Sequence, residues 1–169
     1  GYLTNLSRGQ SFTVGIDGLL AGFEFQFNKS QARATGNAYL SVYSTNGSGA
    51  PDTLLGQESL AASAVGTTHS LVYFDLTSLN ISVSAGDLMF AALSADFNGG
   101  MHSTTDLYAD GSEWGCGPAL LVVCWTAADN GIPDLVFRSH VEPLPTSGTL
   151  ALLGLGLAGL GFVRRRHAA

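Results

Sequence analysis

The strongest constraint on the fold is a short segment in which aromatic and polar residues alternate. Phe23, Phe25 and Phe27 are separated by Glu24 and Gln26. Successive side chains of a β-strand point to opposite faces, so this spacing places three aromatic rings on one face and polar groups on the other. The sequence therefore predicts a half-buried antiparallel strand with its aromatic face against a core.

Similar short segments recur along the chain, separated by Gly, Asn, Asp and Pro. In one of them Val72 and Phe74 lie opposite Leu71 and Tyr73. About nine short strands without an amphipathic helix predict an all-β fold, an antiparallel β-sandwich or jelly roll. Residues 96–110 have the weakest pattern and are expected to form a long loop or lid. The expected strands are 9–14, 19–27, 38–44, 54–60, 69–76, 79–83, 87–94, 119–126 and 134–140.

Composition agrees with this fold class and limits the partners. The 22 glycines and a charged fraction of only 12% suit strands and tight turns rather than helices. Residues 1–140, the expected body, contain four basic and twelve acidic residues, a net charge of −8. Such a body is not expected to bind nucleic acid or an anionic membrane surface. Cations and neutral polymers remain open as ligands.

The order of motifs in the body is distinctive. It runs QSFTV, a Gly-Leu-x-x-x-Phe strand, LSVYSTNGSGAPDTLLG, a Val-x-Phe-Asp-Leu strand and VSAGDLMFAAL, over about residues 10–93. This order resembles the β-sandwich modules that are common in bacterial surface and exported proteins. Members of that group are usually described as non-catalytic, with a topology like that of carbohydrate-binding modules. The resemblance implies a non-enzymatic body.

The residues themselves point the same way. His69, His102 and His140 are scattered along the body. There is no Gly-x-Ser-x-Gly, His-Glu-x-x-His or Cys-x-x-Cys motif, and no Gly-Lys-Ser/Thr that would hold a phosphate. We therefore expect a protein that is not an enzyme and needs no cofactor, with calcium as the one alternative.

That alternative rests on three acidic residues near position 110. Asp106, Asp110 and Glu113 fall within eight positions of a loop-like segment. Ca²⁺ prefers clustered oxygen ligands on loops, so these residues are a candidate calcium site. Their spacing does not match the EF-hand loop, and a solvated acidic loop is the other interpretation.

Aromatic residues beside these acids suggest a sugar-binding platform. Tyr108 and Trp114 would stack on a sugar ring while the neighbouring carboxylates bind its hydroxyls. The other interpretation is structural: Trp125 belongs to the core and Trp114 caps one edge of the sandwich.

The chain has two cysteines, Cys116 and Cys124. An extracellular location would make a disulfide between them plausible. Two cysteines this close in sequence can also lie on strands that never face each other, so two free thiols are the alternative.

Residues 141–169 form a tail with three parts. A Pro-containing hinge, 141–148, precedes an uncharged apolar run, 149–163, and a basic end, 164–169. Since a helix rises about 1.5 Å per residue and a bilayer core is about 30 Å thick, the apolar run alone is marginal, and the whole uncharged stretch, 143–163, is just long enough to cross it. The basic end would hold the C-terminus in the cytoplasm and leave the body outside. The hinge residues are Val141, Glu142, Pro143, Leu144 and Pro145, and the orienting cations are Arg164, Arg165 and Arg166.

The tail sequence, TLALLGLGLAGLGFVRRRH after a Pro-containing hinge, closely resembles the PEP-CTERM sorting signal. This domain is also catalogued as the C-terminal domain of ice-binding proteins, and it is described as a substrate of exosortases in Gram-negative bacteria that make exopolysaccharide. The hinge departs from the family, with Val141-Glu142-Pro143 in place of Pro-Glu-Pro and a likeness to the variant Val-Pro-Leu-Pro. The resemblance implies export, an exosortase partner, cleavage in the hinge, and release from the inner membrane to an envelope or matrix that contains exopolysaccharide. We also expect a signal peptide ahead of Gly1.

Two alternatives to this sorting pathway remain. Residues 144–148, LPTSG, resemble the sortase signal Leu-Pro-x-Thr-Gly, which would make the chain a Gram-positive wall protein. The tail is also suited to be a plain, uncleaved membrane anchor. Ice binding is not expected, because the body lacks the regular Thr-x-Thr arrays of a flat ice-binding face.

Overall fold

A computed structural model describes residues 7–103, 108, 111–116, 126–127 and 134–144. All structural statements below refer to this part of the chain. Most of the expected strand 119–126 and the apolar run of the tail lie outside it. The described elements are β-strands and two short 3₁₀ turns, η1 (Ala62–Ala64) and η2 (Thr77–Leu79).

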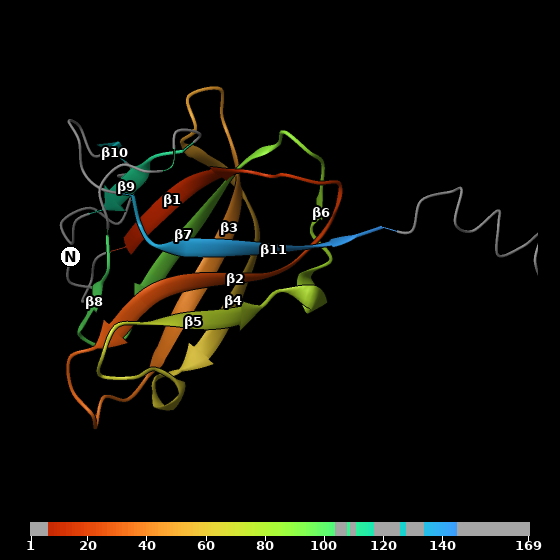
Figure 1. The fold of residues 1–169 in the computed structure, drawn as a ribbon. Helices are drawn as coiled ribbons and strands as arrows, with labels where there is room; N and C mark the ends of the chain where they lie inside the picture. The colour runs from red at the N-terminus through yellow and green to blue at the C-terminus, as the bar shows by residue number, and fades with distance from the viewer. Residues whose placement is uncertain (1–6, 104–107, 109–110, 117–125, 128–133, 145–169) are drawn as a thin grey trace, which may run out of the picture.

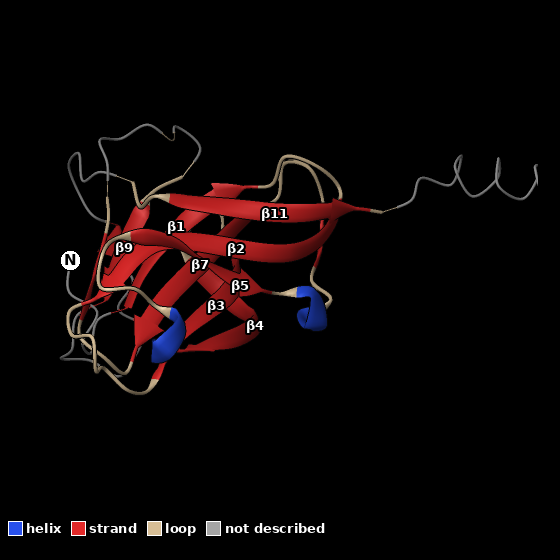
Figure 2. Ribbon diagram, turned by 60° about the horizontal axis from the view of Figure 1, so that its bottom comes forward, coloured by secondary structure: helices blue, strands red, loops and turns tan. Residues whose placement is uncertain are grey.

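The strands form two antiparallel sheets that lie one behind the other in Figure 1 and are seen from a second direction in Figure 2. The larger sheet has the order β10-β9-β1-β7-β3-β4. Its strands are β1 (Ser7–Thr13), β3 (Asn37–Thr45), β4 (Pro51–Ala61), β7 (Leu88–Ala95), β9 (Glu113–Cys116) and β10 (Thr126–Ala127).

The smaller sheet has the order β11-β2-β5, and two further short strands pair with β2. Its long central strand is β2, which carries the aromatic alternation predicted from the sequence. The strands of this sheet are β2 (Gly18–Lys29), β5 (Ser70–Asp75), β6 (Ser82–Val83), β8 (Gly99–Met101) and β11 (Phe137–Pro143). The predicted antiparallel all-β fold is confirmed for the described residues.

The core lies between the two sheets. The side chains of Phe23, Phe25 and Phe27 are fully buried, as their alternation predicts. The ring of Phe23 lies 5.1 Å from that of Phe12 in the other sheet and stacks on Phe137 of β11 at 5.5 Å. Aromatic contacts of this kind bury a large apolar area and hold the sheets face to face.

Two boundaries differ from the sequence prediction. The segment 96–110, expected as a loop or lid, contains β8, because the end of β2 offers it a pairing partner at Phe27 to Lys29. The last strand, β11, continues through Val141 and Glu142 to Pro143, three residues into the expected hinge. Pro143 is tolerated there because it ends an edge strand, where a missing N–H breaks no ladder on the outer side.

A β-bulge shapes the pairing of β2 with β11. His140 pairs with Gly22 and the next residue, Val141, pairs with Leu20, so Ala21 has no partner in β11. A bulge adds one residue to a strand and reverses its alternation. Leu20 and Val141 therefore both pack on the core, while His140 stays on the outer face.

Candidate functional site

The structure places Tyr108, expected in a sugar-binding platform, against the core. Its hydroxyl accepts a hydrogen bond from the backbone N–H of Thr13 in β1 at 2.8 Å. Its ring meets the ring of Phe137 edge-on at 5.3 Å. The backbone N–H of Tyr108 donates to Asp134, which also accepts from the buried Gln10. Tyr108 therefore joins β1 to β11, which is a structural role.

Trp114 lies on the opposite side of the larger sheet. It is only 9% exposed and packs with Phe90 and Ala92 in a small second cluster. The rings of Phe90 and Trp114 meet edge-on at 6.4 Å. A ring buried to this degree offers no face for a sugar, so the structural interpretation of Trp114 fits its surroundings better. Trp125 lies outside the described residues.

Glu113, the third residue of the candidate calcium site, is buried and paired with a cation. Arg8 donates to its Oε1 at 2.7 Å, while Oε2 has no hydrogen-bond partner. Burial raises the pKa of Glu113, and the neighbouring Arg8 partly offsets that rise. Asp106 and Asp110 lie outside the described residues. Within the described part of the chain, no group of three or more His, Cys, Asp or Glu residues is placed to hold a metal ion.

The other predicted residues are mostly beyond the described ranges. Cys116 ends β9, but its side chain and all of Cys124 are outside the description, as are Pro145, Arg164, Arg165 and Arg166. Leu144 is 53% exposed. No helix among the described residues is long and apolar enough to cross a bilayer, and the expected membrane helix is not among them.

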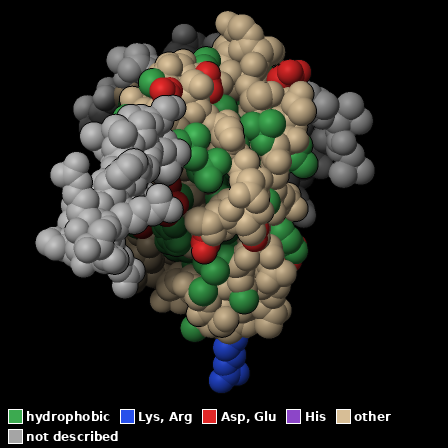
Figure 3. All heavy atoms as spheres, turned by 90° about the vertical axis from the view of Figure 1, so that its right-hand side faces the viewer, with side chains coloured by type: hydrophobic (Ala, Val, Ile, Leu, Met, Phe, Trp, Pro, Cys, Tyr) green, Lys and Arg blue, Asp and Glu red, His purple; other side chains and the backbone are tan. Residues whose placement is uncertain are grey.

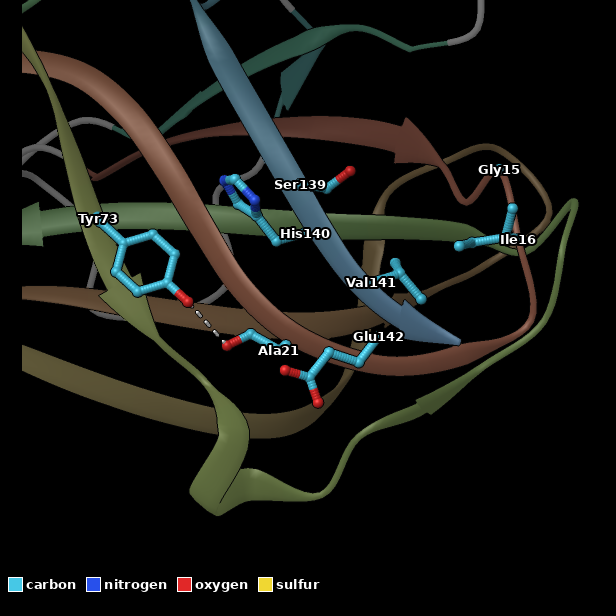
Figure 4. Close-up of a pocket in the computed structure, with 8 residues that line it drawn as sticks. All are labelled: Gly15, Ile16, Ala21, Tyr73, Ser139, His140, Val141 and Glu142. Carbon is cyan, nitrogen blue, oxygen red and sulfur yellow. Dashed lines mark hydrogen bonds between the residues drawn. The ribbon is translucent and has the colours of Figure 1, made fainter. Parts of the chain in front are cut away.

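A hollow of about 630 Å³ lies on the outer face of the smaller sheet. Figure 4 shows Tyr73 and Ile16 on opposite sides of it, with residues of β11 between them. The volume falls in the range of small-ligand sites, roughly 300 to 1,000 Å³. The hollow is lined by Gly15, Ile16, Ala21, Tyr73, Ser139, His140, Val141 and Glu142.

Tyr73 is held in a fixed position on this face. Its hydroxyl donates to the carbonyl of Ala21, the bulge residue, at 3.3 Å. Its ring lies directly over Gly22, where a Cβ would come closer than 3.0 Å to the ring atoms. Glycine is therefore required beneath the ring. Although its ring is seated in this way, Tyr73 remains 45% exposed.

Polar groups from β11 and β2 surround the tyrosine. The ring of His140 lies 5.5 Å from that of Tyr73 and nearly perpendicular to it. His140 Nε2 is 3.1 Å from Glu24 Oε2, and Arg138 approaches the same oxygen at 3.9 Å. The charge of Glu24 is thus partly offset by its neighbours. The carboxylate of Glu142 lies on the lower side of the hollow in Figure 4 and is exposed.

The electrostatic surroundings of Tyr73 are acidic. Burial of the hydroxyl raises the pKa of Tyr73, and the carboxylates of Asp75, Glu142 and Glu24 raise it further. Tyr73 therefore stays a neutral hydroxyl at physiological pH. Figure 3 shows one end of the molecule: acidic side chains are scattered among uncharged ones, and basic atoms are visible at the bottom edge.

The sequence placed Tyr73 on the face opposite Val72 and Phe74 but did not predict the site. The alternation in β5 already places Tyr73 opposite the buried Val72 and Phe74. The contacts with His140 and Gly22 join strands that are far apart in the sequence, and no local pattern gives their register. The rings of His69 and His102, which the sequence analysis described as scattered, lie with their centres 5.6 Å apart.

The described residues define the class of this protein as antiparallel all-β, with an open polar and aromatic hollow on one sheet. No protein-family model matches the chain, and no curated protein matches it.

Proposed function

We propose that the chain is a non-enzymatic exported protein that its C-terminal tail sorts to the cell envelope or to the exopolysaccharide matrix. Support comes from the sequence of the tail: an uncharged stretch, 143–163, that is just long enough to cross a bilayer and is followed at once by three arginines is suited to orient the body outward. An exosortase-type enzyme is the processing partner in this proposal, and the membrane holds the chain before processing.

The path of β11 bears on where in the hinge we expect processing. Val141, Glu142 and Pro143 pair with β2, so they are not free to enter a protease site as an extended strand. Leu144 is the first exposed residue after the strand. We therefore expect cleavage after Pro143 rather than within the first three hinge residues, while the resemblance alone left all five hinge residues open.

The test is fractionation of the native host that expresses the full chain or a chain ending at Leu144. Truncation at this point leaves β11 intact, so loss of sorting cannot be attributed to a damaged sheet. We expect the full chain at the cell surface, shortened by processing, and the truncated chain no longer retained there. The same surface amount and the same mass for both chains would contradict the proposal.

A matched pair of variants tests the orienting role of the basic end. Replacing Arg164, Arg165 and Arg166 together by Gln removes the charge, whereas replacing them by Lys keeps it. We expect the Lys variant to be sorted like the full chain and the Gln variant to lose surface exposure of the body. Protease accessibility of the body in intact spheroplasts measures this. Equal accessibility of both variants would exclude a role for the charge.

A further inference from the structure

The hollow beside Tyr73 has the features of a ligand site that the tail does not explain. It combines an exposed aromatic ring, an exposed apolar residue, Ile16, and polar groups from β11 in one place. One face of the ring packs on the backbone of Gly22, and its hydroxyl is hydrogen-bonded to the carbonyl of Ala21. A pre-positioned ring loses little conformational entropy when a ligand stacks on it.

The polar groups of the hollow include both donors and acceptors. The exposed carboxylate of Glu142 only accepts hydrogen bonds. The hydroxyl of Ser139 and the second ring nitrogen of His140 donate or accept, while the Tyr73 hydroxyl, whose hydrogen is given to Ala21, accepts. A ligand rich in hydroxyls matches this mixture, because each hydroxyl both donates and accepts. A cation would use the acceptors alone.

The charges around the hollow further limit the classes of ligand that can bind. Glu24 is already bonded to His140 and approached by Arg138, and Asp75 accepts two hydrogen bonds from Thr77. These bonds leave both negative charges in place near Tyr73, and among the described residues Glu142 is the carboxylate that lines the hollow itself. An anionic polymer would be repelled by it, while an uncharged one would not.

We propose that this hollow binds a neutral polysaccharide, with a pyranose ring stacked on the exposed face of Tyr73 and sugar hydroxyls bonded to Glu142 and His140. The aromatic ring supplies the apolar contact and the polar groups supply orientation. The site includes Val141 and Glu142, the first two residues of the tail, and none of the tail beyond Pro143. It lies on the outer face of the sheet, away from the Tyr108 and Trp114 platform suggested by the sequence.

The experiment measures binding of the full chain, kept in a zwitterionic detergent without a sugar head group. Isothermal titration calorimetry is run with cellohexaose, xylohexaose and maltohexaose as neutral probes, with hexagalacturonate as the anionic probe and with hexalysine as the cationic one. We expect at least one neutral hexaose to bind and hexagalacturonate not to bind. Failure of all three neutral probes, or binding of hexalysine alone, would overturn the proposal.

Variants of Tyr73 locate the binding on the molecule. Tyr73→Ala is expected to weaken the neutral probe by about tenfold or more, and Tyr73→Phe by no more than about twofold, because it keeps the stacking face. The half-exposed position makes both variants compatible with folding, which the thermal midpoint verifies. An unchanged affinity in Tyr73→Ala would place the ligand elsewhere and refute the assignment.

Two glycine variants test whether the fixed position of the Tyr73 ring matters, without removing any group that contacts the ligand. In Gly22→Ala the new methyl group must displace the ring of Tyr73, so affinity is expected to fall toward that of Tyr73→Ala. In Gly47→Ala the methyl group meets nothing within 4 Å, and affinity is expected to stay unchanged. If the two variants bound equally well, the fixed position of Tyr73 would have no part in recognition.

Discussion

At the scale of single residues, Glu113 is the group whose charge state and fold are most closely coupled. Burial raises its pKa above the usual 4.5, so the folded protein holds a proton on this carboxyl at a pH where the unfolded chain has lost it. The stabilising effect of protonation is complete below about the usual value and is lost as the pH rises through the folded value. Glu113→Gln removes this dependence.

We therefore expect the free energy of unfolding of the wild type, relative to Glu113→Gln, to increase as the pH falls from 7 toward 4.5. Urea denaturation at a series of pH values measures the difference. Arg8→Ala is the companion variant: it leaves a buried carboxylate without its cation and should cost about 3 kcal/mol at pH 7. The same pH slope in wild type and Glu113→Gln would contradict this account.

At the scale of elements, the end of β11 depends on one glycine. Gly18 pairs with Pro143, and a Cβ on Gly18 would come closer than 3.0 Å to the backbone of Glu142 and to the side chain of Val141. Backbone cannot move aside as a flexible side chain can. We expect Gly18→Ala to separate the end of β11 from β2, at a cost of about 1 to 3 kcal/mol.

Hydrogen exchange followed by mass spectrometry measures this change. Peptides that cover 141–143 should exchange faster in Gly18→Ala, while peptides from the larger sheet keep their protection. Gly47→Ala serves as the control, because its methyl group enters open space. Unaltered protection at the end of β11 in Gly18→Ala would show that the close approach does not hold this strand.

The elements that could be predicted from the sequence are those with strong alternation. The strand around Phe25 and the strand around Phe74 bury the residues that their spacing selects, because period-two alternation directly encodes a half-buried strand. The three residues of β8, two of them glycines, carry no such alternation, and their strand forms because β2 extends beyond its pairing with β11, which ends at Phe25, and offers Phe27 to Lys29 on the same edge. Such pairing is a property of register, which one sequence does not show.

The site was less predictable than the fold for a related reason. Tyr73 reaches its position through an extra residue in β2, at Ala21, and a missing side chain at Gly22. Neither feature differs, in the sequence, from an ordinary small residue in a strand. Acids and aromatics near position 110 suggested a site because they are close in sequence, but Trp114 and Glu113 lie on opposite faces of β9 and are both buried.

At the scale of the whole molecule, the two sheets share one core that extends into the tail-proximal strand. Val141 packs against this core, and Phe137 of the same strand stacks on Phe23. The folded unit therefore continues to Pro143, beyond the boundary at residue 140 that the sequence suggested. Because all these contacts belong to one core, we expect the protein to unfold in a single transition. Removal of the end of β11 should therefore lower the stability of the whole folded unit.

Two truncated chains test this boundary. A chain ending at Leu144 keeps every register pair of β11, whereas a chain ending at His140 loses the pairs of Val141, Glu142 and Pro143 and the buried contacts of Val141. We expect the shorter chain to be less stable than the longer one by about 1 to 3 kcal/mol, chiefly from the lost apolar burial. Urea denaturation of both chains, followed by circular dichroism and by tyrosine and tryptophan fluorescence, measures the difference. Equal midpoints would place the end of the folded unit at residue 140 and make the last three residues of β11 part of the hinge.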